Sequence, residues 1–293
     1  MNKLLKKAVS VLLSCSIILL HFTCFATSNV FASEDPNTVT EEIVESAYTL
    51  GILQGYIKPD EISLDQWKEE NVDFEKSYRE GLENNVYDKN TTYTEWLQWN
   101  CYGQGPKDED FIDPNYFYFN NIQRSSVQGF NLQRGDILIT NGTSSAGYVG
   151  HAAICNGDNV VLDMPGPDFK KGTRQISQQQ WIDKYTSKGW VKVYRCPDSN
   201  VAKQAARWAD RNYYSSNGTA TQDIFPEYKI TTNLYSKNPS YCSKLVFHAY
   251  YFGTGSTPVM QNLFRYSLVP PYDLIAAFNL NYQPKLVHKY NKK

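Results

Sequence analysis

The chain has little histidine and almost no excess charge of either sign. It carries four histidines in 293 residues, and its 29 Lys and Arg against 30 Asp and Glu leave a net charge of −1. No basic cluster alternates with aromatic residues, so nucleic acid is not an expected partner. Beyond the first 32 residues no apolar run is long enough to cross a bilayer, and we expect no membrane span there.

Cysteine is also scarce. Six cysteines occur, two of them in the first 32 residues, and the other four are Cys101, Cys155, Cys196 and Cys242. Four cysteines in a chain of this length exclude a small disulfide-dense scaffold, because the chain can bury a core of its own. They allow two disulfides, or one disulfide and two free thiols, and the spacing does not choose between these.

The N-terminus has the pattern of a secretory signal peptide, residues 1–32. Three lysines precede an apolar run from Ala8 to Leu20, and the stretch ends in Val30-Phe31-Ala32. The run is short for a membrane span, and a small residue at its end suits cleavage. We therefore predict a secreted protein, extracellular or associated with the cell wall, with a net charge of about −4 after cleavage.

Residues 33–125 predict a separate, mostly helical segment. Apolar residues recur at helical spacing in Thr38–Ile57, where Thr40 is a candidate N-cap, and two further helices are expected at Ser63–Leu82 and Thr92–Trp99. The sequence assigns this segment no role.

Residues 126–293 form the second predicted domain, where the period changes from helical to alternating. The expected elements are a turn followed by a strand within Leu132–Thr140, strands at Val149–Cys155, Val160–Asp163 and Trp190–Cys196, and helices at Ser177–Lys184 and Val201–Asn212. The Gly- and Ser-rich stretch Asn141–Gly147 is expected to be a loop. The pattern predicts an α+β fold.

A further helix begins near Cys242. Pro239 and Ser240 precede an apolar face that runs to Tyr250, and Ser240 is a candidate cap. Cys242 would then lie in the first turn, where free N–H groups and the helix dipole favour a thiolate. The alternative is an ordinary buried cysteine or half of a disulfide.

Three histidines remain after the signal peptide. His248 is six residues beyond Cys242, about 600° of helix rotation, so it lies on a different face. His288 lies in a basic C-terminal tail. Elimination leaves His151, on a predicted strand, as the base for Cys242, although a single histidine in a strand is more often structural.

Three motifs resemble those of NlpC-type papain-like cysteine hydrolases: Arg134–Leu138, Gly150–Ile154 and Tyr241–Val246. The histidine strand precedes the cysteine helix, which is similar to the circularly permuted, YiiX-like amidase branch, and Pro271–Leu274 resembles the terminal segment of that branch. The resemblance covers about residues 131–274. It implies a permuted papain-like fold, in which an antiparallel sheet packs on the cysteine helix, with an N-terminal helical extension.

The resemblance also implies a carboxylate on the strand after the histidine, which here is Asp163. A two- or four-residue loop at Asn156–Asn159 would turn Asp163 away from His151, whereas an odd loop or a bulge puts both on one face, and we expect the latter. A structural role for Asp163, capping the following turn, stays open. Tyr213 or Tyr214 could supply an oxyanion-hole hydroxyl.

The expected function is a cysteine amidase or peptidase with Cys242 as nucleophile, His151 as acid–base and Asp163 as the orienting group. Export favours peptidoglycan stem peptides as substrate, and no cofactor or metal is expected. An alternative substrate is an N-acyl or lipid amide or ester. The oligomeric state is open.

Three other hypotheses are considered. The chain could be a non-catalytic cell-wall or ligand-binding protein on the same scaffold. A zinc site could form from His151, Cys155, Cys242 and His248, although their spacings fit no common ligand pattern. Cys101, about 50 residues before His151, could be the nucleophile of an unpermuted enzyme, but it ends a predicted helix and lacks the activating position of Cys242.

Overall fold

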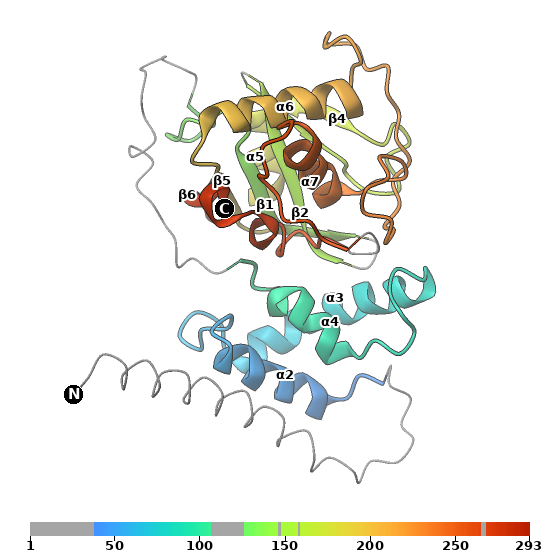
Figure 1. The fold of residues 1–293 in the computed structure, drawn as a ribbon. Helices are drawn as coiled ribbons and strands as arrows, with labels where there is room; N and C mark the ends of the chain where they lie inside the picture. The colour runs from blue at the N-terminus through green and yellow to red at the C-terminus, as the bar shows by residue number, and fades with distance from the viewer. Residues whose placement is uncertain (1–37, 107–125, 146–147, 158, 265–267) are drawn as a thin grey trace, which may run out of the picture. The chain divides into compact units, whose positions relative to one another are not determined.

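The computed structural model describes residues 38–106, 126–145, 148–157, 159–264 and 268–293 (Figure 1). Val39–Lys293 form one compact unit. The predicted signal peptide lies outside the described residues, and the predicted boundary at residue 125 falls in a stretch that is not described. None of the described helices is long and apolar enough to span a membrane.

The three helices predicted for the N-terminal segment are present. They are α2 (Glu41–Leu53), α3 (Leu64–Glu83) and α4 (Tyr93–Trp99). Each begins after a Thr or Ser whose hydroxyl accepts a backbone N–H of the first turn, namely Thr40, Ser63 and Thr92. Ser63 and Thr92 form complete capping boxes with Gln66 and Glu95, so local sequence is sufficient to start these helices.

Aromatic side chains fill the interior of this helical segment. Trp67, Tyr78 and Trp96 are fully buried, and the rings of Tyr78 and Trp96 lie 5.8 Å apart. The indole N–H of Trp67 donates to the Tyr102 carbonyl (3.0 Å), so burial leaves this donor satisfied. The segment packs into the same apolar core as one face of the sheet that follows.

A six-stranded antiparallel sheet follows, so the α+β prediction is confirmed at this level. Its strands are β1 (Ile137–Ser145), β2 (Tyr148–Gly157), β3 (Val160–Asp163), β4 (Arg174–Ser177), β5 (Val191–Arg195) and β6 (Lys285–Tyr290), in the order β4-β3-β2-β1-β5-β6. The sequence did not predict β4 and β6, which lie at the two edges and carry the charged residues common on edge strands. The loop predicted at Asn141–Gly147 was wrong for its first five residues, because β1 continues to Ser145, and residues 146 and 147 lie outside the described residues.

Helices cover both faces of the sheet. On one face, α5 (Gln178–Thr186) packs its Trp181 and Tyr185 in an apolar cluster with Ala153 of β2. On the other face lie α6 (Ser199–Tyr213) and α7 (Cys242–Phe252), both in contact with β2 (Figure 1). Alternate residues of β2 therefore enter different cores.

The motif at the start of β1 has a structural explanation. Arg195 on β5 donates through Nε and Nη2 to the two oxygens of Asp136 (2.7 and 2.6 Å), and both side chains are buried. Asp136 also accepts the backbone N–H of Gln133 (2.7 Å). Asp136 thus joins the turn before β1 to β5. The motif Arg134–Leu138 therefore stabilises the fold and takes no part in the chemistry.

Gly150 on β2 allows close packing next to His151. Its φ is +83°, and a Cβ built on it would lie 2.4 Å from the ring of Tyr272, which is buried. Gly129 has a similar φ of +86°, but a Cβ there would meet no atom within 4 Å. An alanine at Gly129 would therefore cost only backbone strain, whereas an alanine at Gly150 would cost the same strain and steric overlap with Tyr272.

We expect Gly129→Ala to lower the free energy of unfolding by about 1 kcal/mol, the cost of a left-handed alanine. Gly150→Ala should cost about 3 kcal/mol or more, because overlap with the Tyr272 ring adds to the same strain. Urea unfolding of the two variants measures the difference. Equal losses would show that the Tyr272 ring moves aside freely.

Candidate active site

Cys242 is the first residue of α7, as the sequence predicts, but the cap differs. The N-cap residue is Tyr241, and no side chain caps the helix. The predicted cap, Ser240, instead lies 3.2 Å from the Tyr213 hydroxyl. The start of α7 therefore keeps backbone N–H groups that no side chain occupies, and the N–H of Ser243 points to the Cys242 sulfur.

Buried polar contacts hold this end of α7 in place. The Lys244 ammonium donates to the carbonyls of Asn233 (2.8 Å) and Pro239 (2.9 Å). The Ser243 hydroxyl donates to the Val269 carbonyl (2.7 Å), and the Tyr241 hydroxyl accepts the Val269 N–H (3.1 Å). Burial lowers the pKa of Lys244 to about 8. Lys244 thus lies two residues after the thiol, and the hydrogen bonds of its ammonium among the described residues go to carbonyl oxygens.

His151 and Asp163 meet on one face of the sheet. A bulge between Cys155 and Gly157 shifts the register so that Asp163 pairs with Ala153, two residues from His151 on the same side of β2. His151 Nε2 lies 3.0 Å from Asp163 Oδ2, and both residues are 1% exposed. The bulge alternative in the sequence analysis is the one that occurs.

Two residues that the sequence analysis missed complete the surroundings of Asp163. Arg174 donates through Nε to Oδ1 (2.9 Å) and through Nη2 to Oδ2 (3.0 Å), and the Trp181 indole donates to Oδ2 (3.0 Å). Burial alone would raise the pKa of Asp163, but His151 and Arg174 lower it to about 2. The stability that this shift contributes is full above pH 3.8 and is lost as pH falls through about 2. Arg174 escaped prediction because it lies on β4, a strand with only one apolar residue.

The other ring nitrogen of His151 is available to the thiol. Nδ1 is buried and has no hydrogen-bond partner among the described residues. Burial opposes charging of both groups, but His151 and the N–H groups of Ala152 and Ser243 together lower the pKa of Cys242. Asp163 and Cys242 in turn raise the pKa of His151 to about 9. The arrangement favours a thiolate–imidazolium pair.

The remaining candidates lie elsewhere. His248 interacts with the Tyr213 hydroxyl through Nδ1 (2.6 Å) and with the Leu234 carbonyl through Nε2, so neither it nor Tyr213 belongs to the Cys242 group. Burial lowers the pKa of His248 to about 4, which keeps it neutral. The four residues proposed for zinc therefore do not converge, and no group of metal ligands occurs among the residues the structure describes.

Cys101 lacks the properties of a nucleophile. Its sulfur is 3.9 Å from the Asp273 carboxylate, and burial and that negative charge raise its pKa. Cys155 and Cys196 are also free and buried, and their pKa values are raised by burial too. Among the described cysteines, the pKa is lowered only at Cys242.

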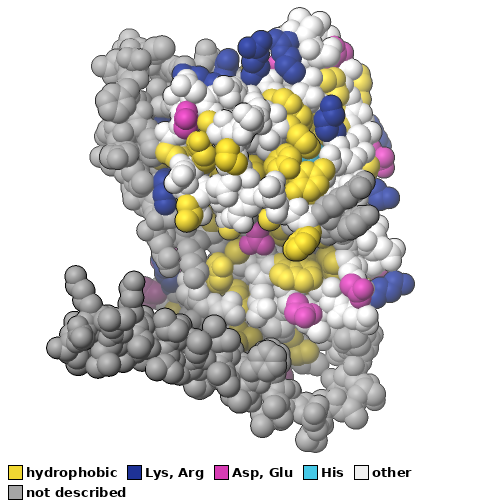
Figure 2. Space-filling model, viewed as in Figure 1, with side chains coloured by type: hydrophobic (Ala, Val, Ile, Leu, Met, Phe, Trp, Pro, Cys, Tyr) yellow, Lys and Arg dark blue, Asp and Glu magenta, His cyan; other side chains and the backbone are white. Residues whose placement is uncertain are grey.

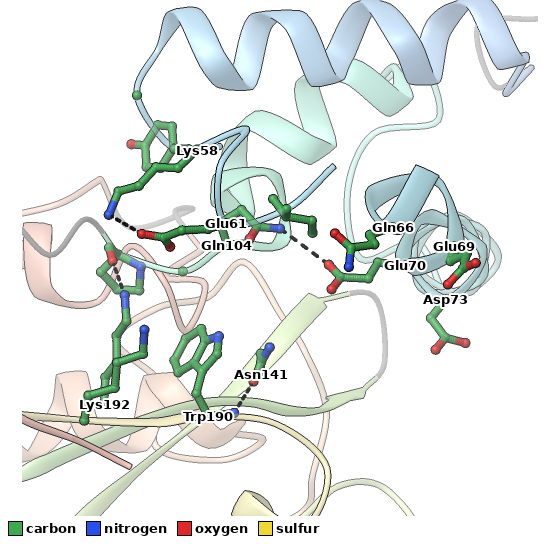
Figure 3. Close-up of a pocket in the computed structure, with 16 residues that line it drawn as sticks. Lys58, Glu61, Gln66, Glu69, Glu70, Asp73, Gln104, Asn141, Trp190 and Lys192 are labelled. Carbon is green, nitrogen blue, oxygen red and sulfur yellow. Dashed lines mark hydrogen bonds and ion pairs between the residues drawn. The ribbon is translucent and has the colours of Figure 1, made fainter. Parts of the chain in front are cut away.

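A cavity of about 790 Å³ lies apart from these residues (Figure 3). One wall is the face of α3 that carries Glu69, Glu70 and Asp73, and the opposite wall carries Lys192 of β5 and Trp190, which directly precedes that strand. Glu70 accepts the Gln104 amide, and burial raises its pKa. Neither Cys242 nor His151 is among the residues that line this cavity. We therefore do not assign it as the substrate site of the thiol.

Comparison with known proteins identifies the family. A family model described as "Lipoprotein N-acylation protein LnsA-like" matches residues 109–290, more than half of the chain. The chain belongs to this family. A protein of Bacillus thuringiensis, named "Uncharacterized 30.3 kDa protein", is 44% identical over 287 residues, which cover 95% of this chain and 99% of that protein. No solved structure matches the chain.

This membership corrects the resemblance drawn from the motifs. The assignment to NlpC-type hydrolases and their permuted amidase branch was wrong, because the matching family is the LnsA-like one, and the peptidoglycan amidase function inferred from it is withdrawn. The three motifs describe only local geometry: a turn with glycine, a strand with histidine and a helix that begins at cysteine. Enzymes with different reactions share such geometry, so the motifs did not identify the family. The alternative of an N-acyl or lipid substrate is the closer one. Export and a cell-wall location stay predictions.

Arg174→Met should lower the free energy of unfolding by about 2 kcal/mol at pH 7, because it leaves the buried Asp163 without two charge-assisted hydrogen bonds. Arg79→Met is the matched control: Arg79 pairs with Glu75 on the exposed face of α3 (2.6 Å), and its loss should cost no more than about 0.5 kcal/mol. Urea unfolding compares the two. A loss at Arg174 as small as that at Arg79 would contradict the importance of this ion pair.

Proposed function

We propose that the protein is a cysteine acyltransferase that acylates an amine of a lipoprotein, with Cys242 as nucleophile, His151 as acid–base and Asp163 as the orienting group. Membership of the LnsA-like lipoprotein N-acylation family supports the reaction class. Two observations support the residue roles: His151 Nε2 lies 3.0 Å from the buried Asp163 carboxylate, and His151 and Cys242 are close enough for each to shift the pKa of the other.

In the first half of the proposed reaction, the Cys242 thiolate attacks the carbonyl carbon of an acyl ester. The negative charge that develops on the oxygen lies near the start of α7, where the Cys242 N–H is free of a side-chain cap. The C–O bond then breaks, and the leaving alkoxide takes a proton from the His151 imidazolium. The products are an alcohol and a thioester on Cys242.

In the second half, the acceptor amine attacks the thioester carbonyl. Neutral His151 takes the proton that the amine loses as the N–C bond forms, and the Cys242 thiolate leaves. The amide product departs and the thiolate–imidazolium pair is restored. Asp163 holds Nε2 throughout, which leaves Nδ1 as the nitrogen that gives and takes the proton.

Burial of the site favours transfer over hydrolysis. Cys242 is 4% exposed and His151 is 1% exposed, so bulk water has little access to a thioester formed there. A second candidate, hydrolysis of an N-acyl or lipid ester by the same residues, requires water to take the place of the amine. The ratio of amide to free acid formed from the same donor separates the two.

Cys242→Ala should abolish acyl transfer from an acyl ester to an amine-bearing lipopeptide, because no thioester can form. Cys101→Ala, which removes another buried thiol, should leave the activity within about twofold of the original. Intact-mass spectrometry after a short exposure to donor should show the added acyl group on the original protein and on Cys101→Ala alone. An acyl adduct that persists in Cys242→Ala would refute the assignment.

The pH dependence of alkylation tests the thiolate–imidazolium pair. Cys242 should react with iodoacetamide well below pH 9, the pKa of an ordinary thiol, because its own pKa is lowered. The pKa of His151 is raised from 6.5 to about 9, so the imidazolium is fully present below 6.5 and is lost as pH rises through about 9. Acyl transfer should therefore fall above pH 9 while alkylation continues. Peptide mapping that finds Cys101 labelled first at neutral pH would overturn this proposal.

A further inference from the structure

A row of aromatic side chains lies on the surface formed by α6, α7 and the segments beside them. Trp208 of α6 stacks on Phe252 of α7 with ring centroids 5.5 Å apart, and Phe252 lies 4.9 Å from Tyr251. Tyr251 lies 5.0 Å from Tyr235, whose hydroxyl donates to the Leu263 carbonyl (2.6 Å). All four rings are partly exposed. We call Trp208, Tyr235, Tyr251 and Phe252 the aromatic row.

Phe264 extends the aromatic row into solvent. It follows Leu263 directly and is 89% exposed, the largest value among the large apolar side chains that the structure describes. A phenylalanine side chain this exposed contributes almost nothing to the stability of the fold, because its ring is not removed from water. The neighbouring Leu263 accepts the Tyr235 hydroxyl, so Phe264 is one residue from a contact with the aromatic row.

A stripe of basic residues runs along α6 next to the aromatic row. Lys203, Arg207 and Arg211 recur every four residues, so they share one side of the helix, opposite the buried side that carries Ala202, Ala205 and Ala209. In the part of the chain that the structure describes, no carboxylate forms an ion pair with any of the three. Figure 2 shows Lys and Arg side chains gathered over α6, with apolar side chains beside them.

We propose that the aromatic row, Phe264 and the basic stripe dock the protein on a bilayer that contains anionic lipids. Tyrosine and tryptophan combine an apolar ring with a polar end, which suits the headgroup layer. Unpaired basic residues beside such rings are attracted to a negative lipid surface. The positive charge of the basic stripe complements an anionic bilayer. A second copy of this chain is a less favourable partner, because its basic stripe would repel this one.

Docking there would hold Cys242 near the lipid surface. Tyr235 belongs to the segment whose Asn233 and Leu234 carbonyls bind Lys244 and His248 of α7, so the docking surface and the start of α7 are rigidly joined. Cys242 and Phe252 are the two ends of this 11-residue helix, which puts them about 15 Å apart. The inference goes beyond the proposed acyl transfer and does not require Cys242 to react.

Vesicle flotation of the predicted mature chain, residues 33–293, tests the proposal. Vesicles of phosphatidylcholine with about one third phosphatidylglycerol should bind the protein more tightly than pure phosphatidylcholine. Lys203→Gln with Arg207→Gln should weaken binding to the anionic vesicles about 25-fold, because each basic residue near such a surface contributes about fivefold. Phe264→Ser should weaken binding to both kinds of vesicle, by about tenfold.

Matched variants control for exposure and charge. Leu280→Ser removes an apolar side chain that is 86% exposed but lies outside the aromatic row, and Lys76→Gln with Lys89→Gln removes two exposed charges from the helical segment. Both should bind like the original chain, and so should Cys242→Ser, which separates docking from catalysis. Absence of binding to anionic vesicles, or equal losses in the control variants, would overturn the docking surface and leave the acyl transfer proposal standing.

Discussion

The Asp163 carboxylate is the group around which the site is built. It accepts hydrogen bonds from His151 on β2, from Arg174 on β4 and from Trp181 on α5, and it is itself on β3. A buried carboxylate is stable only when such partners surround it, so the position of each element is tied to the others. The orientation of the His151 ring, and with it the proposed reaction at Cys242, depends on this arrangement.

Charge is balanced within the same small volume. In the proposed reactive state the ionised Asp163 and the Cys242 thiolate are matched by Arg174 and the His151 imidazolium, so two negative and two positive groups lie close together. This balance explains why the pKa of Cys242 is lowered although burial at 4% exposure opposes a charged sulfur. Cys101 shows the opposite case, because its neighbour is a carboxylate and its pKa rises.

Prediction succeeded where neighbours in the chain decide the outcome and failed where distant residues do. Thr40, Ser63 and Thr92 start their helices as expected, because a capping hydroxyl acts within one turn. Ser240 was expected to do the same, but Tyr213, 27 residues away, competes for its hydroxyl. The resemblance to cysteine hydrolases was wrong for a related reason: the three motifs specify local shape, and the family is defined over the longer stretch 109–290.

The sequence by itself determined that Cys242 lies in the first turn of a helix, that His151 lies on a strand, and that an odd-numbered loop or a bulge is required if Asp163 is to share its face. These follow from periodicity and from turn length, which act over a few residues. Only the tertiary structure decided that the bulge occurs, and that Arg174 and Trp181 complete the surroundings of Asp163. The reason is that burial and charge compensation depend on which elements pack together, and no short stretch of sequence contains that information.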